Sequence, residues 1–163
     1  MSQTISHTDF SSREDFDQAL TERVLSIEPD LVVLAGFMRI LTTQFTNAFA
    51  GKLINIHPSL LPEYPGLDTH KQALENGDLM HGATIHYVDE GLDSGPIIAQ
   101  GALKIDPSQS EAKLAQRIHK IEHALLPKVI AEIAKELISL KGKEVKFESK
   151  SYFGKNNMEF FNV

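Results

Sequence analysis

Two uninterrupted apolar runs of strand length constrain the fold of this chain more than any other feature of its sequence. They are LVVLAGF at residues 31–37 and KLINIH at residues 52–57. An apolar run without alternation is typical of a strand covered on both faces. A capped, acid-rich amphipathic segment predicts a helix over 12–28, and a shorter helix is expected at 42–49, between the two strands. Helices that alternate with such strands predict an α/β fold.

The middle of the chain predicts a pair of strands. Residues 82–90 and 96–105 alternate between apolar and polar side chains, and the turn GLDSG joins them. A short helix is expected before them at 69–77, where Asn-Gly would end it. Together with the first two strands, these segments predict a mixed sheet with flanking helices, in which ligands bind beyond the carboxyl ends of strands.

The last third of the sequence predicts a long amphipathic helix that opens near Asp106. Pro127 is expected to kink this helix or divide it in two. Residues 143–155 predict a terminal hairpin. The expected apolar stripe of the helix is Leu114, Ile118, Ile121, Leu125, Val129 and Ile133.

The bulk properties exclude several classes of protein. A length of 163 residues fits a single domain over 1–163, and the net charge of −6 argues against a nucleic-acid partner. The chain has no cysteine, which excludes thiolate chemistry and suits the cytoplasm. No apolar segment approaches the roughly 18 residues that span a bilayer, so no membrane partner is expected.

The stretch LINIHPSLLPEYPG, residues 53–66, carries the first candidate catalytic pair. Asn55 and His57 are two residues apart on an expected strand, so both side chains point to one face. An amide and an imidazole aimed at one point can hold and polarise a carbonyl group. The alternative is structural: Asn55 caps a strand end and His57 is a hydrogen-bonded histidine beside a turn.

Asp93, in the segment DEGLDSGPI at residues 89–97, is the third candidate. It lies in a turn flanked by Gly91 and Gly95, where a carboxylate can reach out from between two strands. If it faces His57, its charge favours the protonated imidazole and makes that ring a better acid. The alternative is an ordinary turn aspartate.

Other motifs carry less chemistry. His81 and His86, with His57 and His70, do not have the spacing of a standard metal site, so no metal is expected. Neither standard glycine-rich phosphate loop is present. The segment 38–41, Met-Arg-Ile-Leu, follows an expected strand and suits a flat ligand with polar edges as well as it suits the core.

Taken together, the segments DLVVLAGFMRIL, LINIHPSLLPEYPGLDTHKQALENG, HGATIHYVDEGLDSGPIIAQ and RIHKIEHALLP resemble the glycinamide ribonucleotide transformylase family. These proteins, also called phosphoribosylglycinamide formyltransferases, are folate-dependent enzymes of purine synthesis. The resemblance covers most of the chain. It implies the formyltransferase fold, a mixed and mostly parallel sheet with flanking helices.

The resemblance implies transfer of a formyl group from 10-formyltetrahydrofolate to the amine of glycinamide ribonucleotide, without a metal. In this pattern His57 is the proton donor and Asn55 binds the formyl oxygen. Asp93 promotes the charged form of His57 and helps to order a proton-carrying water.

The same resemblance implies binding residues for both substrates. The loop 88–93 would cover the pterin, and Glu122 would contact the ribose of the nucleotide. At His119 the chain departs from the glutamine of many members, so the contact of that residue is open. The expected folate-binding residues are Arg13, Met38, Arg39, Ile40, Leu41 and Asn55.

A larger departure concerns the start of the chain. Members of the family open with a βαβ portion that includes a phosphate loop, and this portion is missing before Arg13. We therefore expect an exposed sheet edge, with self-association through that edge or a truncated chain as the two explanations. The phosphate of the nucleotide would lose its main anchor.

Three alternatives share parts of the pattern. A formyltetrahydrofolate hydrolase uses a similar Asn-x-His and Asp set with water as the acceptor, but it normally carries a regulatory domain. A methionyl-tRNA formyltransferase is longer and has a basic domain that binds tRNA. A folate-binding fragment without activity is the third alternative, because the phosphate loop is missing.

Overall fold

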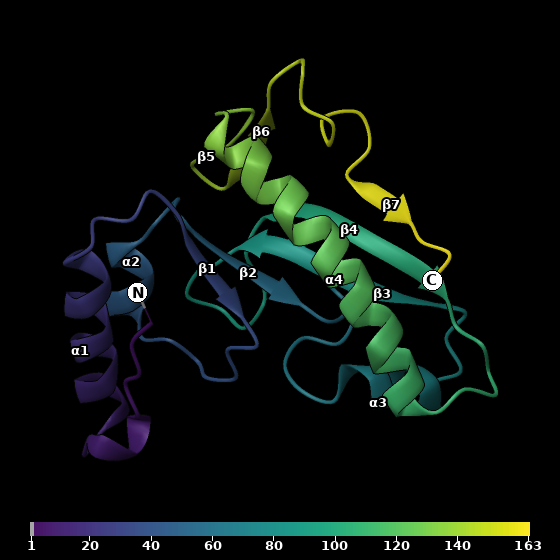
Figure 1. Cartoon of the computed structure of the whole chain (residues 1–163), viewed down its shortest axis with the longest axis horizontal. Coiled ribbons are helices and arrows are strands. Elements are labelled where there is room, and N and C mark those ends of the chain that lie inside the picture. Colours follow the sequence, from purple (N-terminus) through teal and green to yellow (C-terminus); the bar gives the residue numbers. More distant parts are fainter. Residues whose placement is uncertain (1) are drawn as a thin grey trace.

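The computed structural model describes residues 2–163, and Figure 1 shows the arrangement of its elements. Each of the first eight predicted helices and strands is present, with ends shifted by a few residues. No helix within the described residues is long and apolar enough to cross a membrane. In chain order the elements are η1 (His7–Asp9), α1 (Arg13–Leu25), β1 (Val32–Ala35), α2 (Thr43–Ala48), β2 (Leu53–His57), α3 (Thr69–Glu75), β3 (Met80–Tyr87), β4 (Ile97–Lys104), α4 (Glu111–Ala134), β5 (Ile138–Lys141), β6 (Glu144–Phe147) and β7 (Met158–Phe160).

The main sheet has five strands in the order β1-β2-β3-β4-β7. β1 pairs with β2, and β4 with β7, in parallel, whereas β2-β3 and β3-β4 are antiparallel. The register places Asn55 between Leu34 of β1 and His86 of β3. The predicted α/β fold with a mixed sheet and flanking helices is confirmed.

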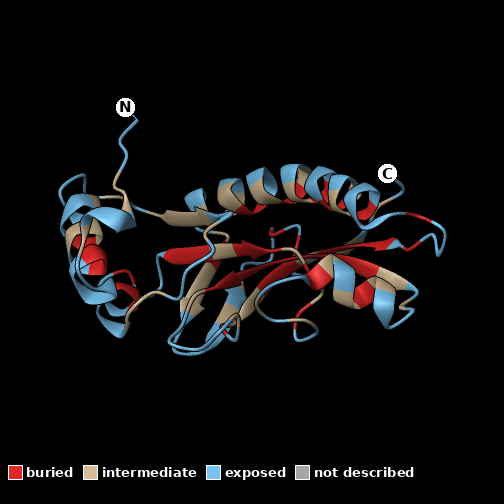
Figure 2. Ribbon diagram, turned by 90° about the horizontal axis from the view of Figure 1, so that it is seen from below, coloured by how far each residue is buried: buried red, intermediate tan, exposed pale blue. Residues whose placement is uncertain are grey.

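Helix α4 lies along one face of the sheet, and its buried residues are on the side that faces the sheet (Figure 2). The hydroxyl of Ser110 caps the helix by accepting a hydrogen bond from the N–H of Lys113 at 3.3 Å. Of the two expected effects of Pro127, a division of the helix does not occur, because α4 is continuous over 24 residues. The stripe predicted from the sequence is buried except at Ile133: Leu114, Ile118, Ile121, Leu125 and Val129.

A second group of apolar side chains joins α1 and α2 to the end of the sheet. Phe45 of α2 and Phe49, which follows that helix, pack against Leu53 of β2, and the two rings lie 4.8 Å apart. The buried carboxylate of Asp17 in α1 accepts a hydrogen bond from the N–H of Thr42, which precedes α2, at 2.5 Å. This contact fixes the two helices to each other beside β1.

The prediction that residues 31–37 form a strand covered on both faces is wrong. β1 is the edge strand of the sheet, its first three residues are half-buried, and Ala35 is exposed. A run of apolar residues does not reveal where a strand lies in the sheet, and an edge position leaves one side of this one uncovered.

The terminal hairpin is displaced from its predicted place at 143–155. β5 and β6 pair as a hairpin over residues 138–147, and Gly142 forms the turn with a φ of 63°. Helix α4 ends at Ala134. Residues 138–141, which precede the predicted hairpin, therefore form strand β5 rather than the end of the helix. β7 was not predicted, because a strand of three residues has no periodicity of its own.

Candidate active site

A cavity of about 1070 Å³ opens beyond the carboxyl ends of β1 and β2. Its wall contains the end of β2, the segment 35–41 after β1, the segment 65–70, the loop 88–93 and one side of α4. This is the position at which ligands bind in open α/β sheets. Asn55, His57 and Asp93 all line it, as the sequence predicted.

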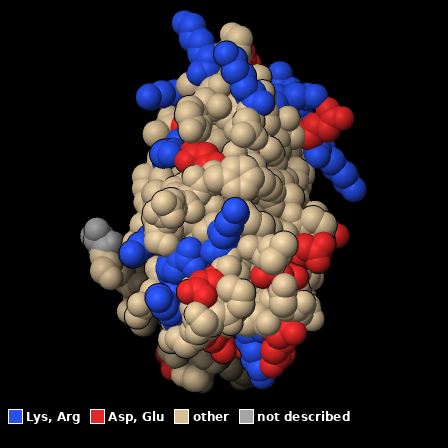
Figure 3. Space-filling view, turned by 90° about the vertical axis from the view of Figure 1, so that its right-hand side faces the viewer, with Lys and Arg blue, Asp and Glu red and all other residues tan. Residues whose placement is uncertain are grey.

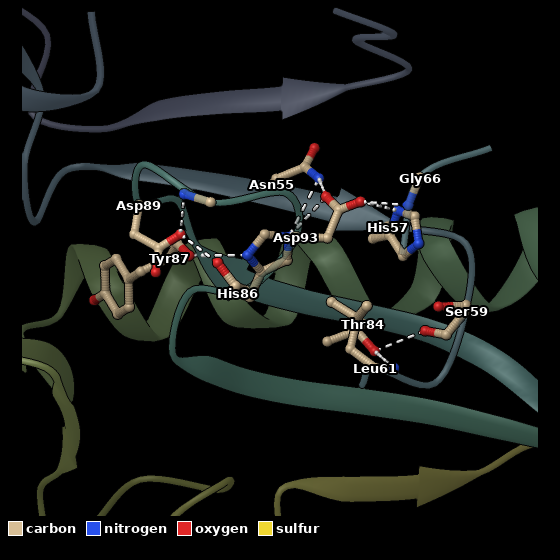
Figure 4. A network of polar contacts seen from close by, with 12 residues as sticks. Asn55, His57, Ser59, Leu61, Gly66, Thr84, His86, Tyr87, Asp89 and Asp93 are labelled. Carbon is tan, nitrogen blue, oxygen red and sulfur yellow. Dashed lines mark hydrogen bonds and ion pairs between the residues drawn. The ribbon is translucent and has the colours of Figure 1, made fainter. Parts of the chain in front are cut away.

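Asp93 contacts both of the other predicted catalytic side chains, Asn55 and His57 (Figure 4). Asn55 and His57 point to the same side of β2, and Asp93 reaches them from the loop between β3 and β4. The Nδ1 atom of His57 is 3.4 Å from Oδ2 of Asp93. The imidazole is buried, with 4% of its surface exposed, so solvent screens this pair poorly.

The other ring nitrogen of His57 is held by the backbone. Nε2 lies 2.8 Å from the carbonyl oxygen of Tyr64, in the proline-rich loop that follows β2. Because a carbonyl can only accept a hydrogen bond, Nε2 carries a hydrogen. Nδ1 is therefore the nitrogen of His57 that can gain or release a proton, and it faces Asp93.

Asp93 is held by several donors. The N–H of Gly66 donates to Oδ2 at 2.9 Å, and the amide of Asn55 donates to Oδ1 at 3.4 Å. Burial alone would raise the pKa of Asp93. The ring of His86, the N–H of Gly66 and the charge of His57 outweigh that effect, and the pKa lies below its usual value. Asp93 is thus a carboxylate near neutral pH.

The backbone of the loop places this carboxylate. Asp93 has a φ of 50°, in the left-handed region that residues other than glycine seldom adopt. Gly95 allows the loop to approach β3, because a Cβ at this position would lie 1.8 Å from the carbonyl oxygen of Tyr87. In the glycine-flanked turn noted in the sequence, Gly95 thus lets the loop pack closely against the strand.

The amide of Asn55 contacts two neighbouring side chains. Its Nδ2 atom lies 3.3 Å from Nε2 of His86 and 3.4 Å from Oδ1 of Asp93. Nδ2 of Asn55 thus lies beside two protein side chains, and the amide oxygen lies on the side away from Asp93 in Figure 4. His86 is a site residue that the sequence analysis considered only as a metal ligand.

The expected folate segment lines the cavity. Residues 38–41 form part of its wall, and Met38 and Ile40 are exposed apolar side chains there. The guanidinium of Arg39 lies over the ring of Phe16, 5.2 Å from its centroid, which holds that side chain against α1. Arg13, in contrast, is not among the lining residues and lies beside Glu14, at 3.6 Å.

Helix α4 forms the opposite wall. The cavity is lined here by His119, Glu122 and Leu126, each of which follows a residue of the buried stripe. His123, the residue after Glu122, lines it as well. Burial raises the pKa of Glu122, although the positive charges of His119 and His123 oppose this. Glu122 lies 3.9 Å from His119.

A pair of histidines supports the remaining wall, and the sequence analysis assigned it no role. Nδ1 of His70, which lines the cavity, is 3.0 Å from Nε2 of the buried His81. Burial lowers the pKa of His81 to about 4, and the positive charge of His70 adds to the effect. Within residues 2–163, no three acidic or histidine side chains are grouped to hold a metal ion.

Comparison with known proteins identifies the family of this chain. The family model described as Formyl transferase matches residues 1–130. The chain is 50% identical over 125 residues to the phosphoribosylglycinamide formyltransferase of Escherichia coli, which covers 77% of this chain and 59% of the relative. It is 53% identical over 127 residues to the trifunctional purine biosynthetic protein adenosine-3 of Drosophila melanogaster, covering 78% of this chain and 9% of that protein.

Solved structures give the same result. The phosphoribosylglycinamide formyltransferase of Coxiella burnetii superposes with a TM-score of 0.84 at 39% identity, over 96% of this chain and 72% of that one. A formyltetrahydrofolate deformylase of Pseudomonas syringae superposes with a TM-score of 0.78 at 29% identity, over 83% and 46%. The chain thus spans at most three-fifths of the length of the two curated relatives, and it belongs to the formyl transferase family.

Proposed function

We propose that this protein transfers the formyl group of 10-formyltetrahydrofolate to the amine of glycinamide ribonucleotide. The observation that carries the proposal is the contact of Asn55, His57 and Asp93 at the end of β2, inside a cavity large enough for two substrates. The names of the relatives with about 50% identity favour the same reaction.

In the proposed reaction the neutral amine attacks the formyl carbon, and a C–N bond forms as the carbonyl oxygen becomes an oxyanion. His57 is the residue that stabilises this charge by donating from Nδ1, because Nε2 is held by Tyr64. The tetrahedral intermediate then loses its bond to N10 of the folate. The proton released by the amine ends on N10, with His57 as the carrier and Asp93 keeping its charged form favourable.

The folate is proposed to lie against residues 38–41 and the loop 88–93. Both segments line the cavity next to Asn55. The exposed side chains of Met38 and Ile40 offer apolar surface for a flat ring, and the backbone of the segment offers hydrogen-bonding groups. Arg13 remains a proposed folate residue that would act from outside the present cavity wall.

The nucleotide is proposed to lie along α4. Glu122 can accept hydrogen bonds from ribose hydroxyl groups, and its half-buried position limits competition from water. His119 is close enough to Glu122 to share the same ligand group. No phosphate-binding loop is assigned within the described residues.

A formyltetrahydrofolate hydrolase is the second candidate, because the Pseudomonas syringae deformylase has the same fold as this chain. The two functions differ in the acceptor, which is an amine in one and water in the other. An inactive folate-binding fragment is the third.

One absorbance assay separates these functions. Release of tetrahydrofolate from 10-formyltetrahydrofolate would be followed with and without glycinamide ribonucleotide. The transferase requires turnover that depends on the nucleotide and yields formylated product. Turnover that is equal in both samples would indicate the hydrolase, and a folded protein without turnover would indicate the fragment.

The proposed partners are therefore small molecules, in the cytoplasm. On the face shown in Figure 3, basic and acidic side chains are interspersed. Self-association through the edge of β1 also remains a prediction, which is tested below.

A further inference from the structure

We propose that Asn76 is a deamidation site of this protein, and that the hydroxyl group of Tyr64 protects it in the folded state. Asn76 and Gly77 are the Asn-Gly pair that follows the last residue of helix α3, and both are exposed. The reaction is the spontaneous conversion of the side-chain amide into a carboxylate. The site lies outside the part of the chain that is proposed to contact substrate.

The chemistry needs only the chain and water. The backbone nitrogen of Gly77 attacks Cγ of Asn76 and loses its hydrogen, a C–N bond forms, and the side-chain nitrogen leaves as ammonia. Water then opens the succinimide at one of its two carbonyl carbons, which leaves an aspartate or an isoaspartate at position 76. Glycine favours the attack because it has no Cβ, and no other part of the described chain lies within 4 Å of where a Cβ of Gly77 would be.

The end of α3 restrains this reaction in the folded protein. The N–H of Gly77 donates to the carbonyl oxygen of Leu74 at 3.1 Å, and the N–H of Asp78 donates to that of Ala73 at 3.1 Å. These are the two bonds of a Schellman motif, in which Gly77 adopts a φ of 69°. The attacking nitrogen is thus engaged, and ψ of Asn76, which is −8°, must change before the five-membered ring can close. The reaction therefore requires local opening of the helix end.

Tyr64 restrains the amide itself. Nδ2 of Asn76 donates a hydrogen bond to the hydroxyl oxygen of Tyr64 at 2.8 Å. Tyr64 is fixed in turn, because its hydroxyl group donates to Oδ2 of Asp78 at 2.6 Å and its ring packs against the apolar cluster that contains Ala73. The rotation that brings Cγ of Asn76 to the nitrogen of Gly77 breaks the bond to Tyr64. This bond is the protection that we assign to Tyr64.

Deamidation would also disturb the active site, because Tyr64 contacts His57. The carbonyl oxygen of Tyr64 lies 2.8 Å from Nε2 of His57. A carboxylate at position 76 has no hydrogen to donate, and the single hydroxyl hydrogen of Tyr64 is already donated to Asp78. The new charge would therefore face the hydroxyl oxygen and the carboxylate of Asp78 without a hydrogen bond. We expect it to loosen Tyr64 and the carbonyl group that orients His57.

Peptide mapping by mass spectrometry tests the site without any substrate. The full chain would be incubated in water enriched in oxygen-18, which labels each carboxyl group newly formed at position 76. Tyr64→Phe removes the hydroxyl partner and should speed this labelling about three- to tenfold. Isoaspartate among the products is the expected mark of the succinimide. Equal rates in Tyr64→Phe and the wild type, or labelling without isoaspartate, would overturn the proposal.

A matched control separates protection by Tyr64 from a general loss of stability. Gly101→Ala crowds Ile121 and changes neither Tyr64 nor Asn76, so it should keep the labelling rate of the wild type under conditions in which both proteins are folded. The wild type unfolded in urea gives the rate of the unprotected chain, which should exceed that of Tyr64→Phe. Equal acceleration in Gly101→Ala and Tyr64→Phe would mean that labelling follows global unfolding, which would overturn the role of Tyr64.

Two substitutions at position 76 test the consequence for His57. Asn76→Asp introduces the carboxylate directly and should shift the ring signals of His57 in ¹H–¹⁵N spectra, with formyl transfer slowed about three- to tenfold. Asn76→Gln keeps an amide donor and should leave these signals near their positions in the wild type. Equal shifts in both variants would overturn the link to His57. Absence of turnover in the wild type would overturn the proposed function and leave the mapping and the spectra valid.

Discussion

His81 is expected to make the stability of the protein depend on pH. Burial lowers its pKa from 6.5 to about 4, so the unfolded chain binds a proton at a pH where the folded protein does not. The contribution of the neutral His81 to the free energy of unfolding therefore has its full value above pH 6.5, and it decreases as the pH falls from 6.5 toward 4. The loss should be about 2 kcal/mol at pH 5, measured by urea unfolding at pH 7 and pH 5.

Two variants check the assignment to His81. His81→Gln removes the titrating group, so the difference in unfolding free energy between pH 7 and pH 5 should shrink. His7→Gln changes an exposed histidine and should keep the difference of the wild type. An unchanged difference in His81→Gln would show that another group is responsible, such as His70, whose pKa burial also lowers.

His57 is expected to contribute to the reaction rather than to folate affinity. His57→Gln removes the Nδ1 atom that faces Asp93, and general acid catalysis typically accounts for about 10²- to 10⁴-fold in rate. We expect a loss of that size in kcat, with folate affinity within a few-fold by fluorescence titration. A large loss of folate affinity would indicate that His57 is structural.

At the scale of single residues, the sequence predicted which side chains meet at the site better than it predicted their hydrogen bonds. Asn55 and His57 share a face because side chains alternate along a strand, which can be deduced from spacing. The contact between Asn55 and His86 depends on the pairing of β2 with β3 and on a local register shift. Neither can be deduced from residues that are 31 positions apart in the chain.

At the scale of elements, Gly101 sets how closely α4 approaches β4. A Cβ at this position would lie 2.3 Å from Cγ2 of Ile121 and 3.0 Å from the ring of Phe161. Gly101→Ala should therefore lower the free energy of unfolding by about 1–3 kcal/mol, measured with urea.

A double substitution tests the cause. Ile121→Ala removes the atoms that the new methyl group would meet, so Gly101→Ala should cost less in that background than in the wild type. Strictly additive costs would mean that the contact between the methyl group and Ile121 does not cause the loss. The backbone freedom of Gly101 would then explain it.

The elements that the sequence predicted well are those with a long period. Helix α4 spans 24 residues, so the phase of its apolar stripe and its buried face were clear despite Pro127. β7 has three residues and is held by pairing with β4, with the N–H of Phe161 bonded to the carbonyl oxygen of Ala102 at 2.7 Å. Its position depends on a partner that is distant in sequence.

At the scale of the whole molecule, the free edge of β1 predicts self-association. The N–H of Val32 bonds to the carbonyl oxygen of Lys52 in the direction of β2, so the N–H of Val33 points away from the sheet. We expect sedimentation velocity to show an association that increases with protein concentration. Val33→Pro removes that outward donor and should weaken it.

The comparison variant for this edge lies on the opposite side of the sheet. Glu159→Pro alters β7, the other edge strand, and should leave an association through β1 intact. A single species at every concentration would rule out self-association, and an equal effect of both variants would place it elsewhere.

Helix α4 carries two stripes that differ in phase by about one residue: one is buried against the sheet and the other lines the cavity. One step along a helix turns a side chain by about 100°. A single-residue insertion near the middle of α4 would therefore rotate core residues outward and cavity residues away from the ligand together. Replacement of side chains on α4, such as His119, can therefore change the substrate without loss of the core, whereas a change in the length of the helix cannot.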